Sequence, residues 1–525
     1  MKYITFTTLM LFLATELFAQ VAGVKKVGDR GDYPTLSAAI ADINSQGLID
    51  HTILELMNGY DQTESFIIHN YPGCTDYNLT IRPEAGATTA ILRSDDAYII
   101  FCDSSNNVAI DGRAGGMGSQ NCLKFEHTNN GNSSTLRIDN GSGNTHIHNC
   151  TIRFDGSRAI NLFQATNSLV EYCDIASYSS GPASNTATIG IKTSHSINSV
   201  IRNNRIHHLH VNQDQYFIYG IQGYVPTVAT SNDSIYNNFI SLNAERTDTT
   251  AFVDGINFNG SADHHLYIYF NTIYISGENV AFGSGKNINI TTKGVADVFN
   301  NICLNTRSNG TGSDFHMAMF YNISDAGMIQ SDFNIVNVSG EGAALGFNNG
   351  FFFTFDEWQA YSGVDGNSIS KPVHLADVRN GDLHLANQSC NDADLLGEPV
   401  LNLPYDIDGE LRHSSLPYCG ADEPAKAAFI ESGTIKTPAQ AQLMPNYPNP
   451  FNAQTMISIT VPELADVSLE IFNLRGEIVA TIFQGMHEAG TFSYIFDANN
   501  LPSGVYFYKL TARGMSQSRK LLLIK

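Results

Sequence analysis

A short repeated pattern in the middle of the chain limits the folds that this sequence can adopt. Each copy has alternating apolar and polar residues, then Asn or Cys, and ends on an isoleucine. Five full copies and two shorter echoes occupy residues 145–152, 168–175, 199–206, 233–240, 265–273, 298–302 and 332–335. Their closing isoleucines are 23 to 34 residues apart. A fixed pattern with a period of about 20–50 residues is typical of proteins built from stacked repeats.

The repeat unit is predicted to contain strands rather than helices. Alternation within each copy places the apolar side chains on one face of a strand. Between copies lie the Gly-Ile pairs 190–191, 220–221 and 255–256, so each coil has at least two short strands. Stacked coils bury a column of apolar residues that no single coil could cover. The Asn-Asn pairs fit left-handed turns whose amides stack from coil to coil. We therefore predict an all-β protein with a right-handed parallel β-helix over residues 72–345.

Composition narrows the classes of partner. The 525 residues include 44 Gly and only 15% charged residues, and 42% are hydrophobic, which argues against disorder. The formal net charge of −22 argues against nucleic acid or an anionic membrane as a partner. It also argues mildly against a polyanionic substrate, unless calcium bridges the two.

Residues 1–19 have the pattern of a secretory signal peptide. Lys2 supplies the positive start, residues 4–13 the apolar run, and Ala19 the small residue before the cleavage site. Export implies an oxidising compartment, in which the eight cysteines can pair. We expect a disulfide between Cys390 and Cys419.

Residues 20–71 are predicted to form an N-terminal cap. Thr35 can cap a short helix whose apolar residues have helical spacing, at Leu36, Ala39, Ile40 and Ile43. The sequence Gly-Asp-Tyr-Pro-Thr at 31–35, Ala-Ala-Ile at 38–40, Gly-Tyr at 59–60 and Glu64 resemble the cap of pectinesterase-like members of the pectin-lyase-like β-helix superfamily. The resemblance implies a β-helix behind the cap. The acid, base and calcium motifs of those esterases and lyases do not occur here, and a fold carries no chemistry with it.

Weak catalytic candidates lie in a polar cluster at 202–215. His208 is a possible base. Asp214 and Asp254 lie on neighbouring repeats and could face each other as a glycosidase pair requires. A loop of solvated polar groups is the favoured reading of this cluster.

The histidines also allow a metal hypothesis. His207, His208 and His210, with His264 and His265 further along, offer imidazole ligands for zinc. Adjacent residues of a strand point to opposite faces, however, so surface histidines are the favoured interpretation. Asp-rich loops at 392–394 and 406–409 suggest calcium, yet neither supplies a full oxygen cage. We predict no metal site and no cofactor, with calcium as the alternative.

A binding face is predicted from the residues that follow the Gly-Ile pairs. Lys192, Gln222 and Asn257 should stack as an outward polar ladder on one sheet. Tyr219, together with Tyr216 and Tyr224, offers flat apolar surfaces nearby. Such a shallow groove suits an extended polysaccharide, whereas ordinary packing of aromatic residues beneath loops is the alternative.

The C-terminal part divides into three further segments. Residues 346–423, with the single Trp, resemble the closing segment of secreted bacterial β-helix proteins, and residues 424–442 have the composition of a linker. Seven or so alternating strands follow in residues 443–525 and predict a small immunoglobulin-like β-sandwich.

The motifs of this last segment carry a second resemblance. Leu-Met-Pro-Asn-Tyr-Pro-Asn-Pro-Phe-Asn at 443–452 and Leu-Pro-Ser-Gly-Val-Tyr at 501–506 resemble the type A C-terminal sorting domain of the type IX secretion system. The resemblance implies recognition by the outer-membrane machinery and release or attachment at the cell surface. A plain adhesion module is the alternative.

Together these features predict a monomer that is secreted or held at the cell surface after passing through the periplasm. Two functions remain for its working part. We favour, narrowly, a module that binds polysaccharide along the solenoid; the alternative is a carbohydrate-active enzyme, namely a polysaccharide lyase, esterase or glycoside hydrolase.

Overall fold

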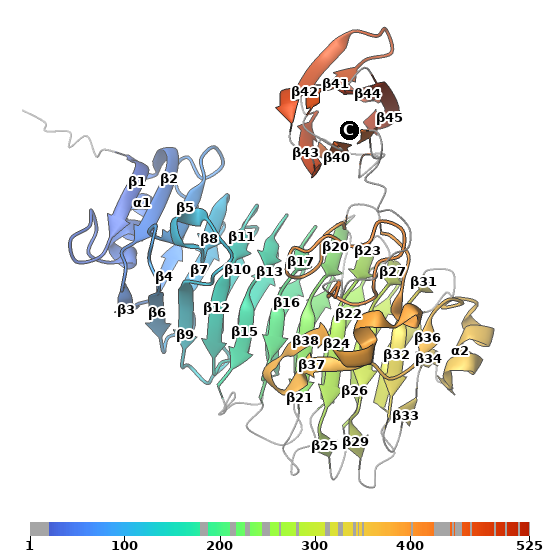
Figure 1. Ribbon diagram of the computed structural model, residues 1–525. Helices are drawn as coiled ribbons and strands as arrows, with labels where there is room; N and C mark the ends of the chain where they lie inside the picture. The colour runs from blue at the N-terminus through green and yellow to red at the C-terminus, as the bar shows by residue number, and fades with distance from the viewer. Residues whose placement is uncertain are drawn as a thin grey trace, which may run out of the picture. The chain divides into compact units, whose positions relative to one another are not determined.

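The parallel β-helix is confirmed, and it has three strands in each coil (Figure 1). In successive coils the chain passes from sheet C to sheet A to sheet B, and each strand pairs in parallel with the equivalent strand of the next coil. The computed structural model describes residues 20–178, 187–210, 217–225, 231–243, 252–261, 264–279, 283–309, 316–323, 329–339, 343–344, 346–348, 351–400, 403–424, 441–443, 446, 454–461, 465–487, 490–498, 501–512 and 515–523. The predicted signal peptide and most of the predicted linker lie outside these residues.

The three sheets run the length of the solenoid. Sheet A comprises β1 (Val21–Val27), β2 (Leu48–Leu56), β5 (Leu79–Pro83), β8 (Val108–Asp111), β11 (His146–His148), β14 (Leu169–Glu171), β17 (Val200–Arg202), β20 (Ser231–Tyr236), β23 (His264–Tyr269), β27 (Val295–Phe299) and β31 (Ile329–Asp332). Sheet B comprises β3 (Asp61–Thr63), β6 (Ala90–Ser94), β9 (Leu123–His127), β12 (Cys150–Phe154), β15 (Asp174–Ser177), β18 (Arg205–His207), β21 (Phe239–Asn243), β24 (Thr272–Ser276), β28 (Ile302–Asn305), β32 (Ile335–Val338) and β36 (Ile369–Ser370). Sheet C comprises β4 (Phe66–Ile68), β7 (Ile100–Asp103), β10 (Ser134–Asp139), β13 (Arg158–Phe163), β16 (Thr188–Ser194), β19 (Phe217–Tyr224), β22 (Phe252–Gly260), β26 (Gly285–Thr292), β30 (His316–Ile323) and β33 (Ala343–Ala344).

The predicted column of isoleucines forms in sheet B. Strand pairing places Ile152, Ile175, Ile206, Ile240 and Ile273 next to one another, and all five are buried in the main core. Stacking of identical branched side chains removes a continuous apolar strip from water, which is the main stabilising term of a solenoid.

The last two predicted members of the column are displaced by one residue. Cys303 pairs with Ile273, and Val336 continues the column, whereas Ile302 and Ile335 belong to a separate apolar cluster. In the full copies one residue separates the Asn or Cys from the isoleucine, but in the echoes the isoleucine follows Asn directly. Because side chains alternate between faces, this one-residue difference turns the isoleucine outward.

The Gly-Ile pairs mark crowded positions in three successive coils. A Cβ on Gly190 would lie 2.6 Å from the carbonyl oxygen of Gly220 and 2.8 Å from Ile206. Gly220 and Gly255 are equally crowded. Glycine is favoured in these three coils because the neighbouring backbone and side-chain atoms leave too little room for a Cβ.

The turn between sheets A and B contains a ladder of buried asparagines. Side-chain amides of successive members donate to the next side-chain oxygen at 2.9–3.1 Å, through Asn204, Asn238, Asn271, Asn301 and Asn334. The residue before each has a left-handed backbone, with φ between 52° and 58°. The predicted role of the Asn-Asn pairs is confirmed.

Cysteines occupy the ladder position in two earlier coils. Cys150 and Cys173 are buried thiols, and each donates to the carbonyl oxygen two residues before it, at 3.3 and 3.4 Å. All eight cysteines are free thiols. Cys390 donates to Leu385 and Cys419 to the carbonyl of Phe333, so the predicted disulfide between Cys390 and Cys419 is not formed. Their thiols are directed to separate carbonyl groups instead of to each other.

The predicted cap helix is α1 (Leu36–Gln46). Thr35 caps it, and its four predicted apolar residues are buried. The phenolic oxygen of Tyr60 accepts from the Leu36 amide at 2.8 Å, and Glu64 accepts from the Ser37 amide at 2.8 Å. A carboxylate at this end of a helix also offsets the helix dipole.

The β-helix extends beyond residue 345, where its end was predicted. Strand β36 adds one more strand to sheet B, after β34 (Gly346–Asn348), β35 (Phe351–Phe353) and α2 (Phe355–Ser362). Trp358 of α2 is buried and donates to Asp365 at 2.9 Å. Strand β36 has only two residues and follows a helix, so its continuation of the stack could not be recognised from apolar periodicity.

Residues 371–423, the return segment, then run back over sheet B (Figure 1). They include β37 (Leu375–Asp377) and β38 (Asp382–Leu385). The left-handed asparagines of three coils donate to return-segment carbonyl groups, with Asn203 bonding Asp406, Asn237 bonding Tyr405 and Asn300 bonding Glu398 at 2.7–2.8 Å. The same turn residues thus shape the coil and hold the segment.

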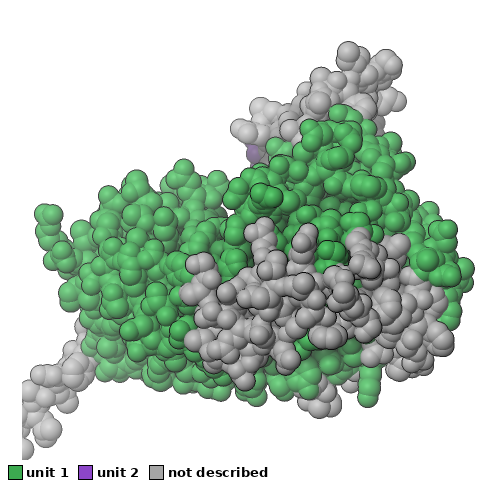
Figure 2. All heavy atoms as spheres, turned by 90° about the horizontal axis from the view of Figure 1, so that it is seen from below, with its two compact units in different colours: residues 1–399, 405–425 green, residues 400–404, 426–525 purple. Residues whose placement is uncertain are grey.

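The C-terminal unit has its own apolar core. It has an antiparallel sheet of β39 (Gln442–Leu443), β40 (Gln454–Val461) and β43 (Gly490–Asp497), and another of β41 (Ala465–Phe472), β42 (Ile478–His487), β44 (Gly504–Ala512) and β45 (Met515–Leu523). The predicted small β-sandwich is confirmed. Figure 2 colours the two units separately. None of the helices in the described residues is long and apolar enough to span a membrane.

Candidate functional site

The outward face of sheet C carries the polar ladder that the sequence predicted. Lys192 pairs with Gln222, and Gln222 pairs with Asn257. Asn161 and Asn289 extend the row by one strand at each end. We call these five residues the sheet C ladder; neighbouring members lie on strands about 4.8 Å apart.

Sequence reasoning missed both end members because their coils lack the Gly-Ile pair. Ala159 and Asn287 stand where the other coils have glycine, and each is followed by Ile and then Asn. A looser pattern, in which any small or amide residue precedes Ile and a polar residue, would have found them.

Cations gather at one end of the ladder. Arg137 pairs with Asn161, and Arg158 lies on the same strand as Asn161. Burial and the charge of Arg158 lower the pKa of Lys192, and burial and Arg137 lower the pKa of Arg158. Three positive charges thus lie on three successive strands, β10, β13 and β16, of a chain with net charge −22.

Few of these polar groups are bonded to other described residues. Arg137 is held by Asp139, at 3.0 Å from its Nε. Within the described part of the chain, Asn161, Lys192 and Gln222 make no side-chain hydrogen bond, and the buried Nε of Arg158 has no partner. The side-chain donors of Asn161, Lys192 and Gln222 therefore have no protein partner among the described residues.

A buried carboxylate lies beside the other end of the ladder. Asp254 is only 4% exposed and accepts from Asn257 at 2.6 Å and from Asn289 at 2.8 Å. Burial raises its pKa, against the influence of Lys286 and the two amides. Tyr219 pairs with Asp254 across the strands, and burial together with this carboxylate raises the pKa of the phenol.

Aromatic rings flank the ladder on both sides. Phe217 stacks on Tyr219 and on Phe252, with ring centroids 5.6 and 5.1 Å apart. At the other ends of the strands, His195 contacts Phe163 and Tyr224 at 5.3 and 5.5 Å. Tyr219 itself is buried, whereas Phe217 and Tyr224 are each 41% exposed, so exposed rings lie on either side of a polar row.

The catalytic candidate His208 is not on this face. Asp214 and Tyr216 lie outside the described residues. His208 follows β18 and has a left-handed backbone, and its Nδ1 lies 2.6 Å from Nδ1 of His207, which bonds Asp174 at 2.7 Å. This chain of contacts belongs to the sheet B side of the coil.

The structure corrects one step of the zinc argument. His207 and His208 do converge, because the left-handed backbone at His208 breaks the alternation of a regular strand. His264 and His265 lie on sheet A, where each bonds a carboxylate on a neighbouring strand at 3.0 Å. The five histidines therefore do not form one group.

The Asp-rich loops that suggested calcium as an alternative contact other protein groups. Asp392 and Asp394 both accept from Lys371, at 2.6 and 2.9 Å. Asp406 accepts three backbone amides, from residues 408, 410 and 423. Their carboxylates already have partners, which explains why these Asp residues occur where they do.

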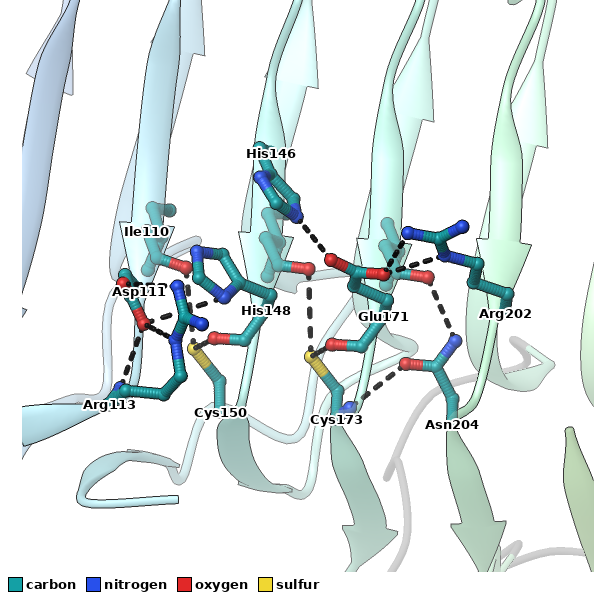
Figure 3. A network of polar contacts seen from close by, with 12 residues as sticks. Ile110, Asp111, Arg113, His146, His148, Cys150, Glu171, Cys173, Arg202 and Asn204 are labelled. Carbon is teal, nitrogen blue, oxygen red and sulfur yellow. Dashed lines mark hydrogen bonds and ion pairs between the residues drawn. The ribbon is translucent and has the colours of Figure 1, made fainter. Parts of the chain in front are cut away.

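Sheet A presents a second polar row, of a different kind (Figure 3). Asp111, His148, Glu171 and Arg202 pair in that order across successive strands. The guanidinium of Arg202 forms an ion pair with the carboxylate of Glu171 at 2.6 Å, and Nδ1 of His148 lies 3.4 Å from Asp111. Burial raises the pKa of Glu171, but the hydrogen bond with His146 and the charge and hydrogen bond of Arg202 hold it at about 2.

Comparison with known proteins identifies the C-terminal unit. The family described as "Secretion system C-terminal sorting domain" matches residues 446–525. This unit is a type IX secretion sorting domain. The protein is therefore secreted or displayed at the cell surface through the type IX machinery, which the sorting domain contacts.

The β-helix has a remote likeness among solved structures. No curated protein sequence matches the chain. Among solved structures, the A-module of the Azotobacter vinelandii mannuronan C-5 epimerase AlgE6 is similar over 65% of this chain and 95% of the module, with 12% identity and a TM-score of 0.22. A score this low carries no argument about function.

Proposed function

We propose that the exported β-helix binds an acidic polysaccharide along the sheet C ladder. The observation that carries this proposal is the run of Arg158, Asn161, Lys192 and Gln222, which have no side-chain partner among the described residues and lie on adjacent strands. An extended sugar chain lying along the solenoid axis would meet new donors about every 4.8 Å.

The local charge favours an acidic chain over a neutral one. Burial first, and repulsion between the cations next, lower the pKa values of Lys192 and Arg158, and carboxylate or sulfate groups would offset that repulsion. The net charge of −22 spread over the whole chain repels polyanions at long range, but salt screens that repulsion beyond about 8–10 Å. Exposed aromatic rings beside the ladder suit the apolar faces of sugar rings.

The test uses the full secreted chain and immobilised polysaccharides matched for backbone but differing in acidic groups. We expect retention on the acidic member of each pair. Lys192→Ala and Arg158→Ala should each weaken binding about 10-fold, since a hydrogen bond to a charged group contributes about 1.5–3 kcal/mol. Lys124→Ala, which removes a half-buried lysine from sheet B, is the control. Equal loss in the control, or equal binding of neutral chains, would refute the proposal.

Asp254 supports a second candidate, a carbohydrate-active enzyme. A carboxyl group with a raised pKa stays protonated at higher pH and can therefore serve as a general acid. Asp254 has such a raised pKa and lies beside Tyr219 on the proposed binding face. New reducing ends, unsaturated products and released methanol would be measured on each retained polysaccharide. Any such activity should disappear in Asp254→Asn without loss of retention; activity that survives the substitution would exclude this residue.

A further inference from the structure

Two histidines and one glutamate converge on the outward face of sheet A, away from the sheet C ladder. His146 and His148 are alternate residues of β11, so both rings lie on the same side of the strand. Glu171 lies opposite His148 on β14. One potential ligand atom from each of the three residues lies within 4.8 Å of the other two.

We propose that His146, His148 and Glu171 form a binding site for a divalent transition-metal ion, with zinc as the favoured ion. Two imidazoles and one carboxylate with a free fourth position are a common zinc ligand set. Ligand atoms of a tetrahedral zinc site lie roughly 3.3 Å apart, given metal–ligand bonds of about 2.0–2.1 Å. Nε2 of His146 is already 2.8 Å from Glu171, so modest rotations of the two rings complete the set.

The surroundings hold the three ligands in place, as Figure 3 shows. Asp111 lies 3.4 Å from Nδ1 of His148 and can orient that ring. Arg113 holds Asp111 through two hydrogen bonds of 2.9 and 3.0 Å. Carboxylates that orient a ligating histidine in this way are typical of metal sites.

Access from solvent also suits a metal. The side chain of His146 is 35% exposed, which gives the ion a path from solvent. Arg202 occupies one oxygen of Glu171 and leaves the other to His146, so the carboxylate would bind through a single oxygen.

The experiment measures metal binding by the full chain after treatment with a chelator. Titration calorimetry and elemental analysis should find one zinc ion per chain, and cobalt(II) should give the visible absorption of a four-coordinate site. His146→Ala should abolish this stoichiometric binding. Asp111→Asn should weaken it about 10- to 100-fold, as expected for a residue that orients a ligand.

His265→Ala is the matched control, because His265 also lies on sheet A, is 32% exposed and bonds a neighbouring carboxylate. It should bind zinc as the parent does. Circular dichroism should confirm that the variants fold, since His146 is exposed enough for its loss to be tolerated. Equal zinc binding by the parent and His146→Ala, a six-coordinate cobalt spectrum, or calcium binding in preference to zinc would overturn the proposal.

Discussion

The outward faces of sheets A and C use charge in opposite ways. On sheet A, Lys26, Glu55 and Arg82 alternate in sign across three strands, with ion-pair distances of 2.7 Å. On sheet C, charges of one sign lie on neighbouring strands, and Lys192 has no ion pair within the described residues. The same stacking of coils therefore produces a neutralised surface on one side and a repelling one on the other.

The difference shows which polar rows maintain the fold. Parallel stacking places equivalent residues about 4.8 Å apart, so opposite charges stabilise the stack and like charges destabilise it. A row of like charges lowers the stability of the fold. Such a row is tolerated where a ligand of opposite charge offsets the repulsion. This contrast leads us to propose that polysaccharide binds on sheet C rather than on sheet A.

The largest expected effect comes from breaking a pair on sheet A. Glu55→Ala removes a 7% exposed carboxylate and leaves Lys26 and Arg82 without it. We expect a loss of about 2–3 kcal/mol, at the lower end for a buried pair because Lys26 is 42% exposed. Urea unfolding, with hydrogen exchange in β2, measures the loss. If Glu55→Ala lowers the free energy of unfolding no more than Lys192→Ala does, the charges on the two sheets do not differ in how they stabilise the fold.

A pH dependence should follow from a third charged surface, where the return segment meets sheet B. Hydrogen bonds to Asp408 and then Asp382 raise the pKa of His384 to about 9 from the usual 6.5. Because the folded pKa is the higher one, this stabilisation is complete below pH 6.5 and is lost as pH rises through 9.

The loss should be on the order of 2 kcal/mol and confined to the return segment. Limited proteolysis and hydrogen exchange of residues 403–412 at pH 6.5 and 10 would measure it. His384→Gln should remove the difference between the two pH values, whereas His413→Gln should keep it. A pH effect that survives in His384→Gln would mean that these pairs contribute nothing to docking.

A change in salt concentration should affect the charges on sheets C and A differently. Raising the salt concentration from about 0.05 to 0.5 M should weaken polysaccharide binding several-fold, because exposed charges on the ligand and on sheet C are screened. The unfolding midpoint should change little, since partly buried pairs on sheet A are screened less. Binding that is insensitive to salt would argue for a neutral ligand.

The smallest expected effect is a gain in stability. Lys192→Met keeps the length of the side chain and removes the repulsion from Arg158. We expect stabilisation of about 0.5 kcal/mol together with weaker binding of the acidic chain. A loss of stability would show that Lys192 has a structural partner and does not serve a ligand.

Local pattern predicted much of this molecule. The cap helix, the buried isoleucines up to Ile273 and the left-handed Asn turns all follow from short-range preferences that repeat, so each coil supports the same prediction. Lys192, Gln222 and Asn257 could be placed in one row because the Gly-Ile pairs set their register.

Other features depend on contacts between distant residues and carry little local signal. The motif His-Ile-His at 146–148 predicts two rings on one face, but nothing in it indicates that Glu171 lies opposite. Arg158 was overlooked because its coil has Ala in place of Gly. The Cys390–Cys419 prediction failed because proximity in sequence does not determine where a thiol points.

The sequence by itself determined a stacked β-helix followed by a sorting domain, because period, turn residues and sorting motifs are local properties. Only the tertiary structure decided which polar side chains of successive coils meet, and therefore which charges are paired and which remain for a ligand. The physical reason is that cross-coil neighbours are separated by about 30 residues of chain but by only about 4.8 Å in space.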